Sequence, residues 1–527
     1  MAVTTSKYRN EIANLFIEDF SSNDYYLFAS SVDALETLDN NSEFSKRQFL
    51  EKTIFGKKIT DVEVYPVIRI NQWQPGTVYS QFDDRADLSN SNFYIVLYPQ
   101  DQSASDYRVF KCLYNNYSAP STQAPNYGQF IPDQIYRTNE DGYTWKFMFS
   151  LTSEDFNRYN ALGYLPIKNY TSTSSSDKGI DQIFIENNIT NDGYTSITGR
   201  VSFKEIPDFV SGIYKITLES AGLNELERYY NGQWIRFERP SGISRLFEIN
   251  LYEYDAINAT GIVTIIDYDD ENADGISVND SFEILPRIEI RGDGNGALAY
   301  PYIENGQIVN ITMHKNGSGY TNAIASVVDP LYDFNPDIAD TVDERAIIRP
   351  IISPDGGHGS NPVVELLSRH VLVYTGLNFV DNTFLPTSNT YTRVGLVKNP
   401  QFYGDSPTRI DNRIRLNLDI NPLSVGDIAT QLDVDNIITF ESIVHQVSNN
   451  TVYLTDYNGP FQNTGNTSVS FDEEKFLTTP QNQTLTINTY VIPDYIQKTG
   501  EVLYMDSFTA IERTSESNEQ FKIILEF

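Results

Sequence analysis

The 527-residue chain contains one cysteine, four histidines, four methionines and three tryptophans. With Cys112 alone, no internal disulfide can form, so we expect a fold that does not depend on oxidation. The histidines, His314, His358, His370 and His445, lie far apart and form no His-x-x-x-His pair, so a zinc site is not indicated. A Gly-x-Ser-x-Gly nucleophile elbow is also missing. The sequence therefore predicts no catalytic residue, no resident metal and no cofactor.

Long apolar runs and basic patches are scarce as well. The run FYIVLY, residues 93–98, is far shorter than the ~20 residues of a membrane-spanning helix. The first residues, MAVTTSKYRNEIANLF, lack the cationic and apolar regions of a signal peptide. Lys and Arg number 38 against 71 Asp and Glu, a net charge of −33, which would repel nucleic acid. We expect a soluble protein made in a cytoplasm, with no membrane insertion and no nucleic-acid partner.

Aromatic residues, by contrast, are abundant, at 13% of the chain. Short runs rich in aromatic and β-branched residues alternate with Pro, Gly, Asn and Asp, which is the pattern of strands and turns. The last segment, GEVLYMDSFTAIERTSESNEQFKIILEF, has a period close to two at Phe521, Ile523 and Leu525, which predicts a strand built into a sheet. The fold class expected is mainly β: several β-sandwich-like domains with a few short peripheral helices.

Three short helices are expected beside the strands. One helical face is predicted by apolar residues with a period of 3.6: Tyr8, Ile12, Leu15 and Phe16. The segment SKRQFLEKTIFG, residues 45–56, predicts a second helix with Leu50 and Ile54 on one face and Gly56 as its stop. The segment TSEDFNRYNAL, residues 152–162, begins with a capping-box spacing and predicts the third.

One loop carries part of a cation-binding pattern. In DENADGISVNDS, the residues Asp270, Asn272 and Asp274 match positions 1, 3 and 5 of an EF-hand loop, but the final position is Ser281 instead of a bidentate Glu. The flanking segments, VTIID and SFEIL, are strand-like and not helical. An acidic hairpin loop is the preferred interpretation, and Asp270, Asn272 and Asp274 are kept as a calcium candidate.

Three other features favour structural roles. The Gly-rich segment GDGNGA, residues 292–297, is not followed by a helix whose N-terminus could bind phosphate, so it predicts a hairpin turn. His358 lies in the turn GGHGSNP, where a ring nitrogen can bond the backbone. Cys112 lies in the strand-like VFKCLY and is expected to be a packed thiol.

Several segments of the chain, taken in order, resemble segments of a known protein family. They are TSKYRNEIANLF, VIRINQWQPGTVYSQFDD, YRVFKCLYNN, NEDGYTWKFMFSL, YLPI and the C-terminal GEVLYMDSFTAIERTSESNEQFKIILEF. Together they resemble the gene-eight baseplate wedge proteins of T-even-like contractile-tailed phages. Gly-Glu-x-x-Tyr-Met before a final apolar strand is the most specific pattern, although SFTAIER stands where these proteins often carry a Pro-rich turn. GGHGSNPVVEL resembles a segment of longer members, such as those of cyanobacterial phages.

The resemblance implies a structural virion protein and not an enzyme. It implies a homodimer that assembles with other baseplate wedge subunits in the host cytoplasm, takes its place in the tail baseplate and has no small-molecule substrate. The alternative is a glycan-binding or glycan-cleaving β protein similar to a tail spike, since Tyr and Asp suit sugar recognition. Against that alternative, no repeat with a period of 20–50 residues is present.

The length of the chain exceeds the roughly 250–300 residues that one core supports, so two to four domains are expected. The polar segment NYTSTSSSDKG, residues 169–179, is the clearest linker. Because the resemblance lies mainly at the two ends, these ends are expected to fold together. The expected organisation is a β-rich domain at 1–170 that shares a core with 490–527, inserted β modules at 180–365, and a further β-rich segment at 366–489 with an insert near 425–475.

Overall fold

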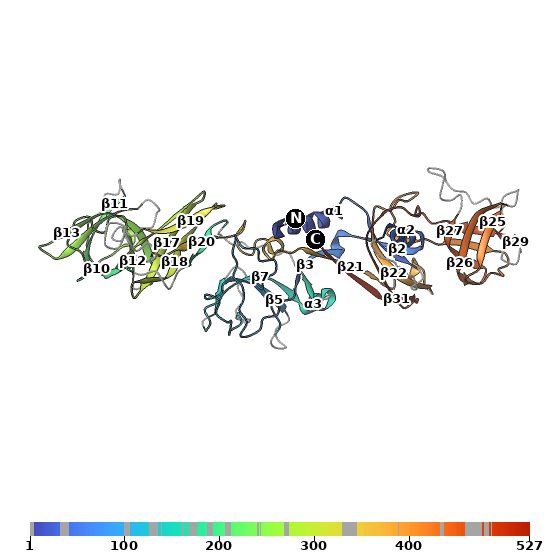
Figure 1. Cartoon of the computed structure of the whole chain (residues 1–527), viewed down its shortest axis with the longest axis horizontal. Coiled ribbons are helices and arrows are strands. Elements are labelled where there is room, and N and C mark those ends of the chain that lie inside the picture. Colours follow the sequence, from blue (N-terminus) through green and yellow to red (C-terminus); the bar gives the residue numbers. More distant parts are fainter. Residues whose placement is uncertain are drawn as a thin grey trace. The chain divides into compact units, whose positions relative to one another are not determined.

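The structure is a computed structural model of the whole chain (Figure 1). It describes residues 5–31, 42–99, 106–125, 135–138, 140–160, 163–167, 177–186, 193–205, 212–239, 242, 244–267, 273–328, 345–387, 389–432, 437–458, 477–478, 484–485 and 487–527. Strands make up 51% of the structure and helices 10%, so the expected mainly β, multi-domain fold is confirmed. No helix within these ranges is long and apolar enough to cross a membrane.

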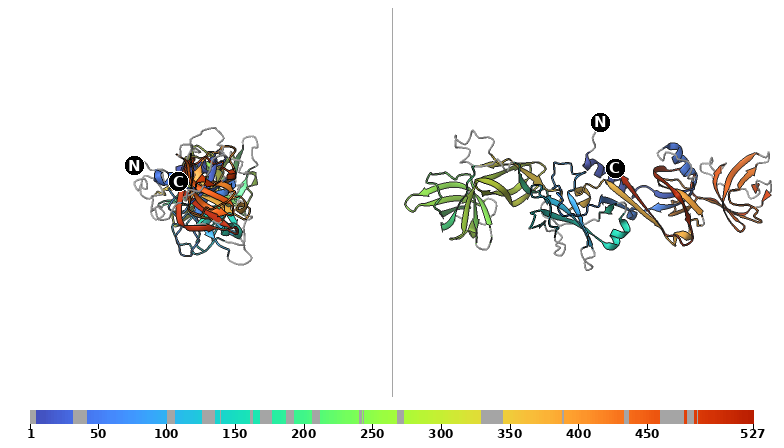
Figure 2. Two further views of the ribbon diagram at one scale, coloured as in Figure 1. Left: turned by 90° about the vertical axis from the view of Figure 1, so that its right-hand side faces the viewer. Right: turned by 60° about the horizontal axis from the view of Figure 1, so that its bottom comes forward.

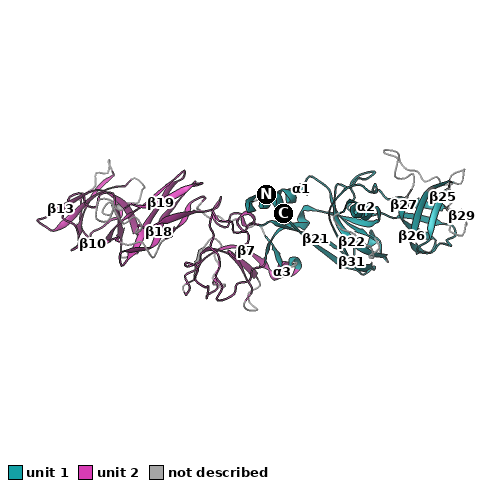
Figure 3. Ribbon diagram, viewed as in Figure 1, with its two compact units in different colours: residues 1–69, 158–167, 368–527 teal, residues 70–157, 168–367 magenta. Residues whose placement is uncertain are grey.

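The chain forms two compact units, each assembled from separate stretches of sequence (Figure 3). Unit 1 comprises residues 1–69, 158–167 and 368–527, and unit 2 comprises residues 70–157 and 168–367. The composition suggested boundaries near residues 170 and 365. The chain also passes from one unit to the other at 69/70 and at 157/158, and the composition of the sequence does not change at either position.

Unit 1 is built around two sheets that face each other across one core. The first sheet has the order β23 (Arg409–Asp411), β2 (Thr53–Ile59), β1 (Tyr25–Ser30), β22 (Asn389–Lys398) and β31 (Glu501–Arg513). The second has the order β32 (Glu519–Glu526), β21 (His370–Leu377), β3 (Val64–Arg69) and β8 (Tyr164–Pro166). Their shared core includes Leu27, Val373 and Ile523.

The C-terminal segment supplies an edge strand to each of these two sheets. β31 pairs with β22, and after a turn β32 pairs with β21. Ile523 is buried in the core, and Phe521 and Leu525 pack against it, as the alternation in the sequence predicts. The Phe527 ring lies 5.0 Å from the ring of Phe16, so the two ends of the chain meet in unit 1 (Figure 2).

The first helix, α1 (Ser6–Asp19), forms where expected but turns a different face inward. Thr5 caps it by accepting the Tyr8 backbone N–H. Tyr8 and Leu15 are both 55% exposed, whereas Ala13 and Asn10 are buried. The amide of Asn10 donates to the Ser368 carbonyl at 2.6 Å, which satisfies a buried acceptor. The predicted common face with Tyr8 and Leu15 buried is therefore wrong.

The second helix, α2 (Glu43–Glu51), is shorter than the sequence pattern suggested. Ile54 and Gly56 lie in β2 and not in the helix, so Gly56 is not a helix stop. A Cβ atom on Gly56 would lie 2.6 Å from the ring of Phe28 on the neighbouring strand. Glycine is needed there for close packing within the sheet.

A separate β module completes unit 1. It is a sheet in the order β29 (Thr484–Leu485), β28 (Leu477–Thr478), β25 (Ile428–Leu432), β26 (Ile438–Ser448), β27 (Thr451–Asn458), β24 (Ile414–Leu418) and β30 (Ile487–Val491). Its own core includes Leu416, Phe440 and Leu454. Short 3-10 turns also occur in unit 1, at η1 (Asp61–Glu63) and η4 (Asp381–Thr383).

Unit 2 combines a small sheet with a closed barrel. The sheet has the order β4 (Tyr94–Leu97), β5 (Asp106–Tyr114), β7 (Thr144–Thr152) and β6 (Ile135–Arg137), and α3 (Ser153–Tyr159) follows β7. The barrel has the order β10 (Ile197–Lys204), β11 (Ile213–Glu219), β14 (Thr260–Ile266), β13 (Ser244–Asp255), β12 (Trp234–Glu238) and β15 (Ser281–Leu285). Buried side chains such as Ile235 and Tyr252 form the core of the barrel.

Three strand pairs complete unit 2. They are β16 (Arg287–Gly292) with β19 (Ala323–Val328), β17 (Asn295–Glu304) with β18 (Gln307–Ser318), and β9 (Ile180–Ile185) with β20 (Ile348–Ile352). Asn305 and Gly306 have positive φ and turn β17 into β18, as expected of Asn-Gly. The segment 292–297 is no hairpin, because β16 and β17 each pair with a different strand.

Candidate functional site

Four ionisable side chains meet inside unit 2. Lys111 lies on β5, Asp181 lies on β9, His358 lies in a Gly-rich turn, and Glu365 ends the short helix α5 (Pro362–Glu365). The Lys111 ammonium donates to the Glu365 carboxylate, and the His358 Nε2 atom is bonded to the Asp181 carboxylate. The side chains of Lys111 and Glu365 are 0% and 1% exposed. We call these four residues the Lys111 network.

Backbone groups and an aromatic ring complete the surroundings of the Lys111 network. The second oxygen of Glu365 accepts the Gly359 N–H at 2.8 Å and the Asn361 N–H at 3.2 Å. The ring of Phe82 lies 4.5 Å from the Lys111 Nζ atom, and its centroid is 5.0 Å from that of His358. Since both carboxylate oxygens of Glu365 have donors, its buried charge is well compensated.

These contacts determine the charge states in the network. Burial alone would raise the pKa of Glu365, but Lys111 and His358 outweigh it and lower that pKa to about 2. Complete burial lowers the pKa of Lys111, and the carboxylates of Glu365 and Asp181 oppose that shift. Glu365 is therefore a carboxylate at neutral pH and holds no proton that it could donate as a general acid.

The arrangement indicates a structural clamp. Its members come from three stretches that are far apart in the sequence, at Lys111, at Asp181 and at 358–365, and the ion pair at its centre has no access to solvent. None of the four is a hydroxyl or thiol that a His–carboxylate pair could activate as a nucleophile. A second clamp in unit 2 joins Asp83 to Arg349 through two bonds of 2.9 and 3.1 Å.

Of these four residues the sequence singles out only His358, whose Gly-rich turn predicts a ring nitrogen bonded to the backbone. The structure corrects this, because the ring nitrogen is bonded to Asp181. Two features of the sequence could have indicated the buried ion pair. Lys111 is a lysine inside the apolar strand VFKCLY, and Glu365 is an acid at the end of PVVE. A charge in an apolar run predicts burial with a partner, but only the fold identifies that partner.

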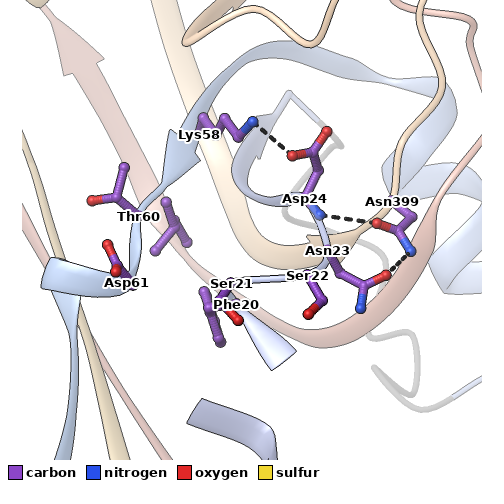
Figure 4. Close-up of a pocket in the computed structure, with 10 residues that line it drawn as sticks. Phe20, Ser21, Ser22, Asn23, Asp24, Lys58, Thr60, Asp61 and Asn399 are labelled. Carbon is purple, nitrogen blue, oxygen red and sulfur yellow. Dashed lines mark hydrogen bonds and ion pairs between the residues drawn. The ribbon is translucent and has the colours of Figure 1, made fainter. Parts of the chain in front are cut away.

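A pocket of 520 Å³ in unit 1 lies where α1 ends and β1 begins (Figure 4). Its lining is mostly polar and includes Asn23, Asp24, Lys58, Asp61 and Asn399. Figure 4 shows a chain of bonds from Lys58 to Asn23: Lys58 lies 2.6 Å from Asp24, the Asp24 N–H donates to the Asn399 side chain at 3.0 Å, and the Asn399 amide donates to Asn23 at 2.7 Å.

Asp24 is the charged group most constrained in this pocket. Burial raises its pKa, but bonds from Lys58 and Ser406 outweigh burial and hold the pKa below its ordinary value. An ion-paired carboxylate of this kind is a poor general acid at neutral pH. In this charge state Asp24 does not fit the protonated acid of a glycosidase pair.

The other residues singled out from the sequence are those of the calcium candidate and Cys112. Asp270 and Asn272 lie outside the described residues, and of Asp274 only the backbone is described, in the turn η2 (Ala273–Gly275). Within the described ranges, no three His, Cys, Asp or Glu residues are placed to hold a metal ion. Cys112 is a buried thiol whose pKa burial raises, so the expected packed role is confirmed.

The other three histidines lie in separate strands of the fold. His314 is in β18, His370 in β21 and His445 in β26. Burial lowers the pKa of His370 to about 4, and burial has the same effect on His445. Both are therefore neutral at pH 7, which suits packed side chains in sheets.

Comparison with known proteins does not assign the chain to a family. The chain matches no protein-family model, and no curated protein is significantly similar to it.

Proposed function

We propose that this chain is a structural subunit of the baseplate wedge of a contractile phage tail. The observation that supports it is that the segments carrying the resemblance pack against one another. In unit 1 the N-terminal helix, the YLPI segment in β8 and the C-terminal strands all belong to the two-sheet core or its immediate cover. Segments that together form one scaffold are expected to share a core. Segments that resembled the family by chance would have no reason to pack against one another.

The same holds in unit 2. The Trp73 ring N–H donates to the Ser121 hydroxyl at 3.1 Å, and that hydroxyl donates to Asp141 at 3.0 Å. Trp73 and Asp141 belong to two different resembling segments, so Ser121 links them. Lys111 and Glu365 likewise join YRVFKCLYNN to GGHGSNPVVEL. Asp141, Lys111 and Glu365 thus join separate segments of the fold, which suits a structural virion subunit.

The experiment that tests this function is analysis of purified virions from the source phage. We expect the chain to co-purify with intact tails at a fixed copy number that is a multiple of the tail's rotational symmetry. Density for the two-sheet core of unit 1 is expected in a map of the baseplate. Recovery of the chain only in the soluble fraction of infected cells, with none in tails, would refute the proposal.

We also propose that the chain forms a homodimer, as the resemblance implies. Two chains of −33 repel each other, so a stable interface must be largely apolar and bury on the order of 2,000 Å². Salt screens charges beyond ~8–10 Å, so raising the salt concentration is expected to preserve or tighten the dimer. Sedimentation at low and high salt measures this. A monomer at micromolar concentration in both conditions, or a dimer that dissociates as salt rises, would contradict it.

A further inference from the structure

One short loop of unit 1 presents three large apolar side chains to solvent. The loop joins β21 to β22 and contains η4; we call residues 378–384 the Phe379 knob. Phe379 is 75% exposed, Val380 55% and Phe384 61%. Single exposed apolar residues are common, but a cluster of large ones on a loop marks an interaction site.

The backbone of the Phe379 knob is fixed by a buried carboxylate. The fully buried side chain of Asp381 accepts the Asn378 N–H at 2.7 Å and is ion-paired with Arg409. Burial raises the pKa of Asp381, but these bonds outweigh it and hold the pKa below its ordinary value. The charged Asp381 side chain therefore ties the start of the loop to Arg409 of β23, and its backbone carbonyl accepts the Phe384 N–H at 3.0 Å at the other end.

A second set of bonds ties the knob to the turn between β31 and β32. The Asn382 amide donates to the carbonyl oxygens of Ser515 and Ser517 at 2.9 and 3.0 Å, and its oxygen accepts from the buried Arg513. The apolar side chains thus stand on a rigid support. Rigid aromatic anchors lose little entropy on binding, which is the usual property of the energetic centre of an interface.

The rim of the knob is acidic. Glu516 lies between the two serines bonded by Asn382 and is exposed. The cations described beside the knob are already paired with acids. Arg409 is paired with Asp381 and lies 5.2 Å from the Phe384 ring centre. Arg513 is paired with Glu519, and Lys57 lies 3.6 Å from Glu63. A partner therefore meets aromatic side chains next to uncompensated negative charge.

We propose that the Phe379 knob inserts into an apolar cleft, rimmed by Lys or Arg, on a different protein. Charge complementarity favours such a partner over the alternatives. A second copy would bring its own Glu516 to the same rim, and anionic lipid would also be repelled. Within the proposed function the partner is another wedge subunit, but the surface is derived from unit 1 alone and does not depend on that role.

The test is site-specific photo-crosslinking in the cells that naturally assemble the protein. Phe379 is replaced by p-benzoylphenylalanine in the full chain, and cross-linked peptides are identified by mass spectrometry. We expect a cross-link to a different polypeptide, in an apolar stretch flanked by Lys or Arg. The matched control places the same analogue at Ile257, which is 94% exposed in the turn between β13 and β14 of unit 2.

Second-site variants show whether the contact is specific. In the chain carrying the analogue at Phe379, Phe384→Ser is expected to lower the cross-link yield at least tenfold, and Glu516→Lys severalfold. Ile257→Ser should leave the yield unchanged. All four side chains are exposed, so thermal melting should not change, and this measurement separates lost binding from lost folding.

Several results would overturn the inference. They are cross-links only to another copy of this chain, no cross-link at all, or binding of the purified chain to phosphatidylcholine–phosphatidylserine vesicles that Phe379→Ser abolishes. A cross-link to a basic-rimmed cleft on a protein that is absent from tails would uphold the inference and refute the wedge function. The two proposals can therefore fail separately.

Discussion

Removal of residues 521–527 is expected to unfold unit 1, including its N-terminal helix. The deleted residues supply the buried Ile523, and Phe521, Leu525 and Phe527 pack against the same core. At ~1.5–3 kcal/mol for each large apolar side chain, their loss is comparable to the whole stability of a domain, about 5–15 kcal/mol. Circular dichroism and differential scanning calorimetry of the truncated chain measure this as the loss of one thermal transition.

Two point variants show whether the loss of stability comes from the buried side chain or from shortening the chain. Ile523→Ala is expected to lower the stability of unit 1 by about 2–5 kcal/mol, because it leaves a cavity in the core. Gln520→Ala, on the same strand but exposed, should change it by less than about 0.5 kcal/mol. If the truncated chain retained both thermal transitions, the shared core of the two ends would not be a folding unit.

Lys111→Met is expected to destabilise unit 2 by about 3–5 kcal/mol, because it leaves the Glu365 carboxylate buried without its cation. The double variant Lys111→Met with Glu365→Gln should recover part of this loss, since no uncompensated charge then remains. Lys215→Met, on the barrel strand β11, is the matched control. Denaturant unfolding monitored by tryptophan fluorescence measures all three. Equal stability of Lys111→Met and the unchanged chain would show that the ion pair is not formed.

The same ion pair sets an acid limit on the stability of unit 2. The pKa of Glu365 is about 2 in the folded protein, below its ordinary value of 4.5. A lowered carboxyl pKa contributes stability above the unfolded pKa, and this contribution is lost as the pH falls from about 4.5 towards 2. The unchanged chain should therefore lose about 3 kcal/mol more across this range than the double variant. Acid titration of both proteins, followed by their unfolding, measures this difference. Equal losses of stability in the two proteins between pH 4.5 and pH 2 would contradict it.

Local patterns were enough to predict the secondary structure of several segments. The alternation at Phe521, Ile523 and Leu525 predicts the strand that the structure contains, because a period of two places alternate side chains on one face. The dipeptide Asn305–Gly306 is typical of a tight hairpin, since both residues tolerate positive φ, and the structure has that hairpin between β17 and β18. Burial of Cys112 followed from its apolar neighbours. Each of these depends only on residues close together in the chain.

By itself, then, the sequence determined the mainly β class, the strand at the C-terminal end and the packed thiol. Only the tertiary structure decided which face of α1 is buried, since that depends on the carbonyl of Ser368, which Asn10 reaches across the fold. It also decided that Gly56 serves close packing against Phe28, and that Lys111 finds its partner in Glu365. The physical reason is the same in each case: a buried polar group or a missing side chain is explained by an atom far away in sequence, and local periodicity carries no information about that atom.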